Sequence, residues 1–165
     1  MQRAIAHSPA GHWSDDAARD RVTLDFDTRH RRRLRLTTDA GVPVLLDLPR
    51  AVAMADGDGL QLDDGGWLLV QAAAEEVAEI SAVSQHALMR IVWHLGNRHI
   101  PTEIFSDAVY IRPDHVLEEM VQGLGASVRR LQAPFQPEGG AYGGHGPAHG
   151  HGHGHDHDHE HGHEH

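Results

Sequence analysis

The chain has 165 residues, with 24 Asp and Glu, 14 Arg, 17 His, no Lys and no Cys, and a formal net charge of −10. The absence of Cys excludes disulfide frameworks, thiolate metal sites and cysteine nucleophiles. The acidic balance argues against nucleic-acid binding, which requires a basic face. The N-terminal stretch lacks the apolar segment of a secretory signal, and no run approaches the ~18 apolar residues of a membrane helix. We therefore expect a soluble, cytoplasmic protein that binds neither nucleic acid nor membrane.

Residues 1–74 have the residue alternation and turn chemistry of a small all-β domain. Apolar Val22, Leu24 and Phe26 alternate with polar residues, as in a strand with one buried face. Asp-Gly pairs predict turns at 56–59 and 63–66. Further strands are expected at 30–37, 42–48, 60–62 and 67–70. His7 and His12 lie in a polar N-terminal stretch, and we expect both to be exposed.

Residues 75–140 alternate strands with helices. Strands are expected at 76–80, 102–105, 108–111 and 127–133. A first helix is expected at 82–95, and a second begins at Pro113 or Asp114 and ends near Gly123 or Gly125. The apolar stripe expected on the first helix consists of Val83, Ala87, Ile91, Val92 and Leu95. The order β-α-β-β-α-β predicts a ferredoxin-like domain, so the fold class is α+β.

The third segment, residues 141–165, is a His-rich tail. Its composition becomes rich in Gly, Pro and His near Pro134, and Phe135 is one of the few apolar residues beyond that point. Such a segment cannot bury enough surface to offset the entropy of ordering, so we expect it to be disordered without a ligand. The tail holds ten of the 17 His: His145, His149, His151, His153, His155, His157, His159, His161, His163 and His165.

The tail histidines predict metal binding, because neutral imidazole suits Ni(II), Cu(II) and Zn(II). At ~2–4 imidazoles per ion, they could hold on the order of 2–5 ions. An affinity tag and an inert low-complexity tail are the alternatives, but the alternation of His with Gly and acids favours native metal binding. The sequence leaves the metal open, since the usual affinity order favours Cu(II) over Ni(II) and Zn(II).

Outside the tail, His99 is the strongest candidate ligand. It follows the end of the first helix and precedes Pro101, and one imidazole there cannot hold a metal alone. In a two-fold homodimer the same residue occurs twice at the interface, so two His99 rings would supply half of a four-coordinate site. His86 and His94 share a helical face that we interpret as solvated, although His94 is not excluded as a ligand. His115 is a weak surface candidate, and His30 is expected on the surface.

Five stretches resemble urease accessory protein E, the family of nickel metallochaperones of urease maturation. They are RRRLRLTTDAG (31–41), LDLPRAVAMADGDGL (46–60), HLGNRHIP (94–101), PDHVLEEMVQGLGASV (113–128) and APFQPEGGAYGGHGPAHGHGH (133–153). The resemblance implies a first domain similar to the peptide-binding domain of Hsp40-type chaperones. It also implies a ferredoxin-like metal-binding domain through which two copies form a homodimer.

The resemblance also implies site residues. The family's interface ligand matches His99, and its C-terminal ligands match tail histidines, with His145 and His149 nearest the folded part. Some members carry two surface His two positions apart. Here His115 matches one of them and Pro113 stands at the other position, so one ligand of that peripheral site is missing.

The resulting hypothesis is a non-enzymatic carrier that binds Ni(II) at the dimer interface and through the tail. It would deliver the ion to the urease accessory GTPase (urease accessory protein G) and the urease apoprotein complex. Zn(II) or Cu(II) would suit the same ligands. The alternatives are a storage or buffering protein for divalent metals, and a folding chaperone whose β domain holds urease subunits. We found no catalytic motif of the hydrolase, P-loop or metalloprotease type.

Overall fold

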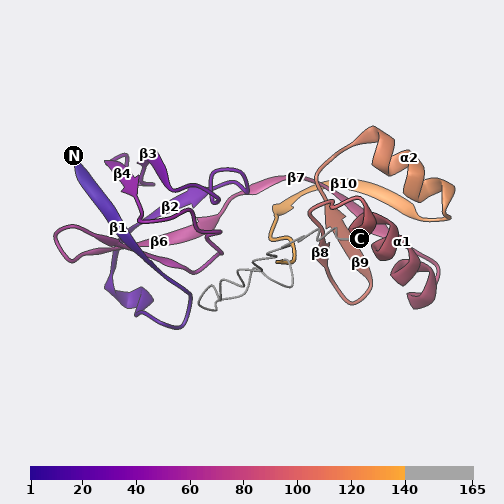
Figure 1. Ribbon diagram of the computed structural model, residues 1–165, viewed down its shortest axis with the longest axis horizontal. Helices are drawn as coiled ribbons and strands as arrows, with labels where there is room; N and C mark the ends of the chain where they lie inside the picture. Colours follow the sequence, from indigo (N-terminus) through magenta and orange to yellow (C-terminus); the bar gives the residue numbers. More distant parts are fainter. Residues whose placement is uncertain (140–165) are drawn as a thin grey trace, which may run out of the picture.

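The computed structural model describes residues 1–139 and contains two sheets that lie side by side along the long axis of the molecule (Figure 1). The first sheet is built from residues 2–72 and carries no α-helix, whereas the second is built from residues 74–134 and is packed with two helices. The prediction of an all-β domain followed by an α+β domain is therefore confirmed. The histidines at 145–165 lie outside the described residues.

The first sheet has six strands in the order β2-β6-β5-β1-β4-β3. The strands are β1 (Gln2–Ser8), β2 (Ala18–Leu24), β3 (Arg33–Thr37), β4 (Pro43–Asp47), β5 (Gly59–Leu62) and β6 (Trp67–Ala72). The β1–β4 and β2–β6 pairs are parallel and the other pairs are antiparallel. Fully buried Leu46, Leu60 and Val70 belong to its core. The predicted turns are also present, since Gly57 and Gly65 have φ of 86° and 85°, values that favour glycine.

Strand β1 is the main element that the sequence analysis missed. It lies between β4 and β5, inside the sheet, yet its buried residue is the small Ala4 and its largest apolar residue, Ile5, is 38% exposed. The usual alternation of large apolar and polar residues is therefore absent from this strand. The expectation that His7 is solvated was wrong. Its ring lies against Asp58 with a 2.6 Å distance between Nε2 and Oδ2, and its side chain is only 10% exposed.

The second sheet has four strands in the order β10-β7-β9-β8. Along the chain the elements are β7 (Ala74–Ser81), α1 (Gln85–Asn97), β8 (Glu103–Ile104), β9 (Ala108–Ile111), α2 (His115–Gly123) and β10 (Ser127–Pro134). Both helices begin at a side-chain cap. Ser84 accepts a hydrogen bond from the Ala87 N–H, and Asp114 accepts from the N–H groups of Val116 and Leu117.

The buried stripe of α1 differs from the predicted one. Leu88, Ile91 and Leu95 are buried, whereas Val83 is 94% exposed because the Ser84 cap places it before the helix. The later helix start removes Val83 from the stripe, whereas Leu88 belongs to it because it lies three residues before Ile91 on the same face.

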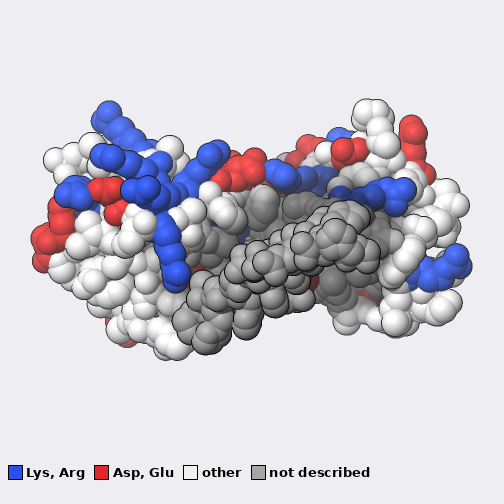
Figure 2. Space-filling view, in the orientation of Figure 1, with Lys and Arg blue, Asp and Glu red and all other residues white. Residues whose placement is uncertain are grey.

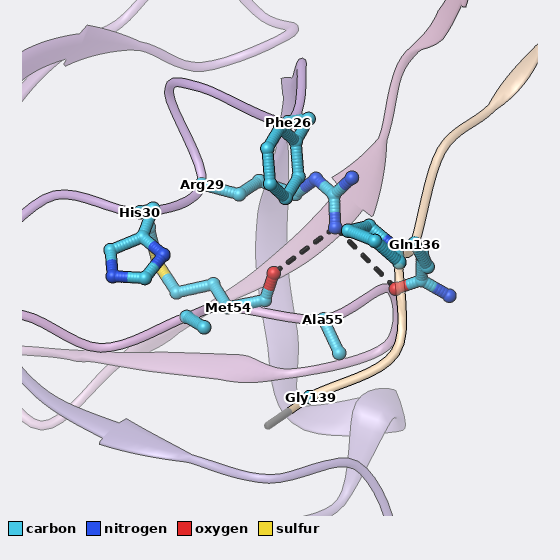
Figure 3. Close-up of a pocket in the computed structure, with 9 residues that line it drawn as sticks. Phe26, Arg29, His30, Met54, Ala55, Gln136 and Gly139 are labelled. Carbon is cyan, nitrogen blue, oxygen red and sulfur yellow. Dashed lines mark hydrogen bonds between the residues drawn. The ribbon is translucent and has the colours of Figure 1, made fainter. Parts of the chain in front are cut away.

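The segment after β10 joins the two domains. Phe135 was placed by composition at the start of the low-complexity region, but its side chain is fully buried and packs edge-on against Phe26 at 5.3 Å between ring centroids. The buried Arg29 of the first domain donates to the carbonyl oxygen of Phe135. It also donates to the Met54 carbonyl oxygen and to the side-chain oxygen of Gln136, as Figure 3 shows. The start of the segment with low-complexity composition is therefore structured and is fixed to the first domain.

The same segment is also held by the second domain. The Gln136 N–H donates to the Glu103 carboxylate at 3.0 Å, and the Glu138 N–H donates to the Thr102 carbonyl at 2.8 Å. The chain thus reaches the end of the described residues while fixed between the two domains.

Replacing Arg29 with Met should lower the free energy of unfolding by about 2–5 kcal/mol, because buried carbonyl groups of Phe135 and Met54 lose their donor. Urea unfolding followed by circular dichroism measures the loss. Arg31→Met, at an exposed neighbouring position, should change it by less than about 0.5 kcal/mol. Equal midpoints for the two variants would contradict the anchoring role.

Asp58 gives a pH prediction. Burial opposes its ionisation, but hydrogen bonds from His7 and from the N–H groups of Ala55 and Ala10 outweigh burial and lower its pKa below the usual 3.8. Because the folded-state pKa is the lower one, ionised Asp58 stabilises the fold above about pH 4, and this stabilisation is lost as the pH falls through the folded-state value.

Asp58→Asn should therefore be less stable than the natural chain at pH 7 and should lose less further stability between pH 5 and pH 3. Chemical unfolding at a series of pH values measures this difference. Asp16→Asn removes an exposed carboxylate and should follow the natural chain. If the stability of Asp58→Asn falls with pH in parallel with that of the natural chain, the buried carboxylate does not cause the loss of stability in acid.

Candidate metal centre

A single copy of residues 1–139 does not assemble a metal site. Within this range, no three His, Asp or Glu side chains lie close enough together to hold a metal ion. The described histidines are instead distributed over both domains. His12, His30, His86, His99 and His115 are exposed, His94 is half-buried, and His7 is held by Asp58. Any metal centre that uses these residues therefore needs ligands from elsewhere.

His99 lies at a structurally specialised position, directly after the end of α1. Its N–H donates to the Gly96 carbonyl at 3.0 Å, and the Ile100 N–H donates to the Leu95 carbonyl at 3.2 Å. This pair of bonds is the Schellman motif, in which the residue corresponding to His99 adopts a left-handed conformation. His99 has φ of 55° and is the one non-glycine residue with positive φ among residues 1–139.

Glycine is the usual residue at this position of a helix end, because a side chain in the left-handed conformation costs about 1–2 kcal/mol. A residue kept at such a position despite this cost is a candidate for function. The motif also fixes the backbone of His99 while its ring remains exposed to solvent. His99 is therefore presented outward from a rigid support, as a ligand shared with another chain would require.

The helix that ends at His99 carries an exposed apolar face, which we call the α1–β8 face. It consists of Met89 and Trp93 from α1 together with Ile104 and Phe105 at β8, which are 62%, 64%, 45% and 40% exposed. These four side chains line a shallow hollow of about 340 Å³. The sequence analysis missed this face. Its signal was the i, i+4 spacing of Met89 and Trp93, which lie outside the buried stripe.

The other predicted candidates are not brought together with His99 into a group of three. His94 packs its ring edge-on against Trp93, at 5.1 Å between centroids. His115 is the first residue of α2 and is exposed, and the neighbouring Glu118 is engaged with Arg130 at 3.1 Å. His86 is exposed near the start of α1, as predicted, whereas His94, which was expected on the same solvated face, is half-buried.

A backbone hydrogen bond holds the start of the His-rich segment close to the stretch of chain that contains His99. The Glu138 N–H is bonded to the carbonyl of Thr102, which is three residues beyond His99. His145 is seven residues beyond Glu138, so fewer than about 25 Å of extended chain separate the two. The predicted ligands His145–His165 themselves lie outside the described residues.

Neither α-helix in residues 1–139 has the length and apolarity needed to cross a membrane.

Comparison with known proteins gives matches along most of the chain. The model of the UreE urease accessory protein N-terminal domain matches residues 2–73, and that of the C-terminal domain matches residues 75–165.

Individual relatives agree with these matches. A urease accessory protein UreE from Bradyrhizobium sp. (strain ORS 278) is 55% identical over 138 residues, which cover 84% of this chain and 66% of the relative. One from Rhodopseudomonas palustris (strain BisB18) is 53% identical over 86% of this chain and 67% of its own length. One from Rhodobacter capsulatus is 43% identical over 90% of this chain and 96% of its own length. The chain thus spans about two thirds of the first two relatives, and it belongs to the UreE urease accessory protein family.

Proposed function

We propose that this protein is a nickel metallochaperone for urease assembly. It acts as a homodimer in which two copies of His99 bind one Ni(II) ion, and imidazoles of the His-rich segment complete the coordination. The ion is cargo, which the dimer passes to the urease accessory GTPase and then to the urease apoprotein. No bond of a substrate is made or broken, so the activity is transfer and not catalysis.

The observation that carries this proposal is the position of His99 at the end of the helix that bears the α1–β8 face. An exposed apolar hollow lined by Met89, Trp93, Ile104 and Phe105 is typical of an interaction surface. A two-fold dimer formed through this face would pair each α1 with its copy and would bring the helix ends, each with its His99, to the same interface. One copy supplies too few ligands among its described residues, and the dimer doubles them.

The three parts of the chain would then have different roles. Residues 75–140 form the dimer and hold the central ion, residues 141–165 supply exchangeable imidazoles, and residues 1–74 contact protein partners. The anchor at Glu138 supports this division, because it starts the His-rich segment beside Thr102 and therefore near His99. Imidazole ligands must be neutral to bind a metal, so nickel capture should weaken in acid. Zn(II) and Cu(II) would compete for the same ligands.

Metal storage is the rival function, and the ten His of residues 145–165 favour it. In that case the His-rich segment alone would hold the ions and His99 would have no role.

Nickel stoichiometry separates the two functions. After deletion of residues 145–165, the two His99 of the dimer should retain one Ni(II) per two chains at lower affinity, with water in place of the missing imidazoles. His99→Gly in the same background should abolish this binding. The storage function predicts that the deletion removes all binding and that His99→Gly changes nothing. Equilibrium dialysis of the intact chain and these variants gives the numbers.

His99→Gly suits this test because glycine is favoured at the left-handed position, so loss of metal would not reflect loss of fold. His86→Ala, an exposed His on the same helix, is the matched control and should keep the site. Two results would contradict the proposal: a truncated chain that binds no nickel, and a His99→Gly chain that still binds it.

The dimer makes a separate prediction. Trp93→Glu puts a charge into the apolar hollow, and it should convert the dimer to a monomer with little effect on the fold, since Trp93 is 64% exposed. Val83→Glu, at an apolar residue that is 94% exposed and does not line the hollow, should remain dimeric. Sedimentation velocity measures the mass of each. A dimeric Trp93→Glu chain would place the interface elsewhere.

A further inference from the structure

An arginine-rich surface lies on the first domain, far from the α1–β8 face in sequence. We call it the arginine surface and define it by exposed Arg31, Arg32, Arg33, Arg35 and Arg50. On β3, Arg33 and Arg35 alternate with the half-buried Leu34 and the buried Leu36, so the arginines are on the outer side of the strand. Figure 2 shows blue side chains gathered over the part of the molecule where Figure 1 draws β3 and β4.

The arginine surface carries more positive charge than its neighbours neutralise. Two carboxylates lie beside it. Asp47 on β4 is shared by Arg3 at 2.5 Å and Arg33 at 3.8 Å, and Asp25 lies within electrostatic range of Arg31 without forming an ion pair with it. No ion pair involving Arg31, Arg35 or Arg50 is present within residues 1–139. This excess is notable in a chain whose net charge is −10. Exposed guanidinium groups without an ion-pair partner favour an acidic ligand.

Backbone geometry at the same place favours an extended ligand. β3 is the last strand of the first sheet, in the order β2-β6-β5-β1-β4-β3, and it pairs with β4 on one side only. Its outer edge has no strand partner among the described residues. An extended segment can add to such an edge through main-chain hydrogen bonds. The surface therefore fits an extended acidic peptide.

The end of the described chain lies close to this surface. Gly139 and His30 line the same hollow, together with Arg29 and Met54, in the close-up of Figure 3. His30 directly precedes Arg31, and β3 begins three residues later, at most about 11 Å of chain away. The chain thus leaves residues 1–139 beside the arginine surface.

The segment that follows has the required chemistry. It contains four acids within ten residues, Asp156, Asp158, Glu160 and Glu164, and no Arg or Lys. Asp156 is 17 residues beyond Gly139, and a Gly-rich linker of that length spans on the order of 20–25 Å. We propose that, in the metal-free protein, the acidic end of this chain's own His-rich segment, residues 156–165, docks on the arginine surface along the edge of β3.

This docking would respond to metal. With neutral imidazoles, residues 156–165 carry four negative charges, and each bound divalent ion adds two positive charges. Two ions would therefore cancel the charge that attracts the segment to the arginines. Loading would release residues 156–165 from the first domain and leave the arginine surface open. Docking itself concerns the metal-free chain, so it can be tested whether or not the nickel proposal above holds.

Paramagnetic broadening tests the docking directly. The chain has no Cys, so Gly162→Cys gives a single attachment point for a nitroxide label. In metal-free protein at 50 mM NaCl, amide signals of Arg33–Thr37 should fall below about half of their intensity with the reduced label. They should recover at 500 mM NaCl, because salt screens exposed charges. They should also recover on loading with Zn(II), which is diamagnetic.

Charge-removal variants identify the contact. Broadening should disappear in the triple variant Arg31→Gln, Arg33→Gln, Arg35→Gln, and also when Asp156, Asp158, Glu160 and Glu164 are changed to their amides. The matched control is Arg90→Gln, Arg98→Gln, Arg129→Gln, which removes three exposed arginines of the second domain and should keep the broadening. Circular dichroism establishes that each variant is folded.

Four outcomes would overturn the proposal. The first is the absence of broadening in the natural chain. The second is broadening that survives Zn(II) loading or the arginine substitutions. The third is broadening of equal size in a mixture in which one set of molecules carries the nitroxide label and a different set is isotope-enriched. That result would show that the segment docks on a second copy of the chain. The fourth is a shift of β3 signals by added poly-glutamate without any effect from the label, which would assign the surface to a partner protein.

Discussion

The buried guanidinium of Arg29 is the contact on which the arrangement of the molecule depends. It reaches from the first domain to the backbone at Phe135 and to Gln136, while the same segment is bonded to Glu103 and Thr102 of the second domain. Buried charges of this kind are stable only when hydrogen-bonded, so Arg29 and the segment hold each other in place. The result is a fixed starting point for the His-rich part of the chain.

From this starting point, the chain that follows Gly139 needs to extend only a short distance to reach either of two different surfaces. On one side is His99 at the end of α1, and on the other is the arginine surface that begins after His30. The first combines a rigid ligand with an apolar face and suits assembly around a metal. The second combines an open strand edge with unneutralised positive charge and suits an acidic peptide. The proposed roles follow from these different chemistries.

The sequence was most informative where local physical signals are strong. Asp114 caps the second helix at a predicted start, and Gly57 and Gly65 form the expected turns, because these residue types satisfy local backbone requirements. The predicted start of the first helix was wrong, because the Ser84 cap was not recognised. The sequence also failed for β1, whose buried residue is only Ala4, and for Phe135, whose burial depends on Phe26 from a distant part of the chain. His99 was identified as a candidate, but its left-handed backbone and the apolar face near it required the structure. Long-range packing of this kind leaves little periodic trace in the sequence.

The bond between the Glu138 N–H and the Thr102 carbonyl has a kinetic consequence. In the proposed carrier, it would shorten the tether between His99 and the imidazoles that follow, whose effective concentration at His99 is set by tether length, on the order of millimolar for short flexible linkers. Ligand exchange at His99 would then proceed at a rate independent of how dilute the protein is. Lengthening the tether between Gly139 and His145 would slow this exchange without altering a single ligand.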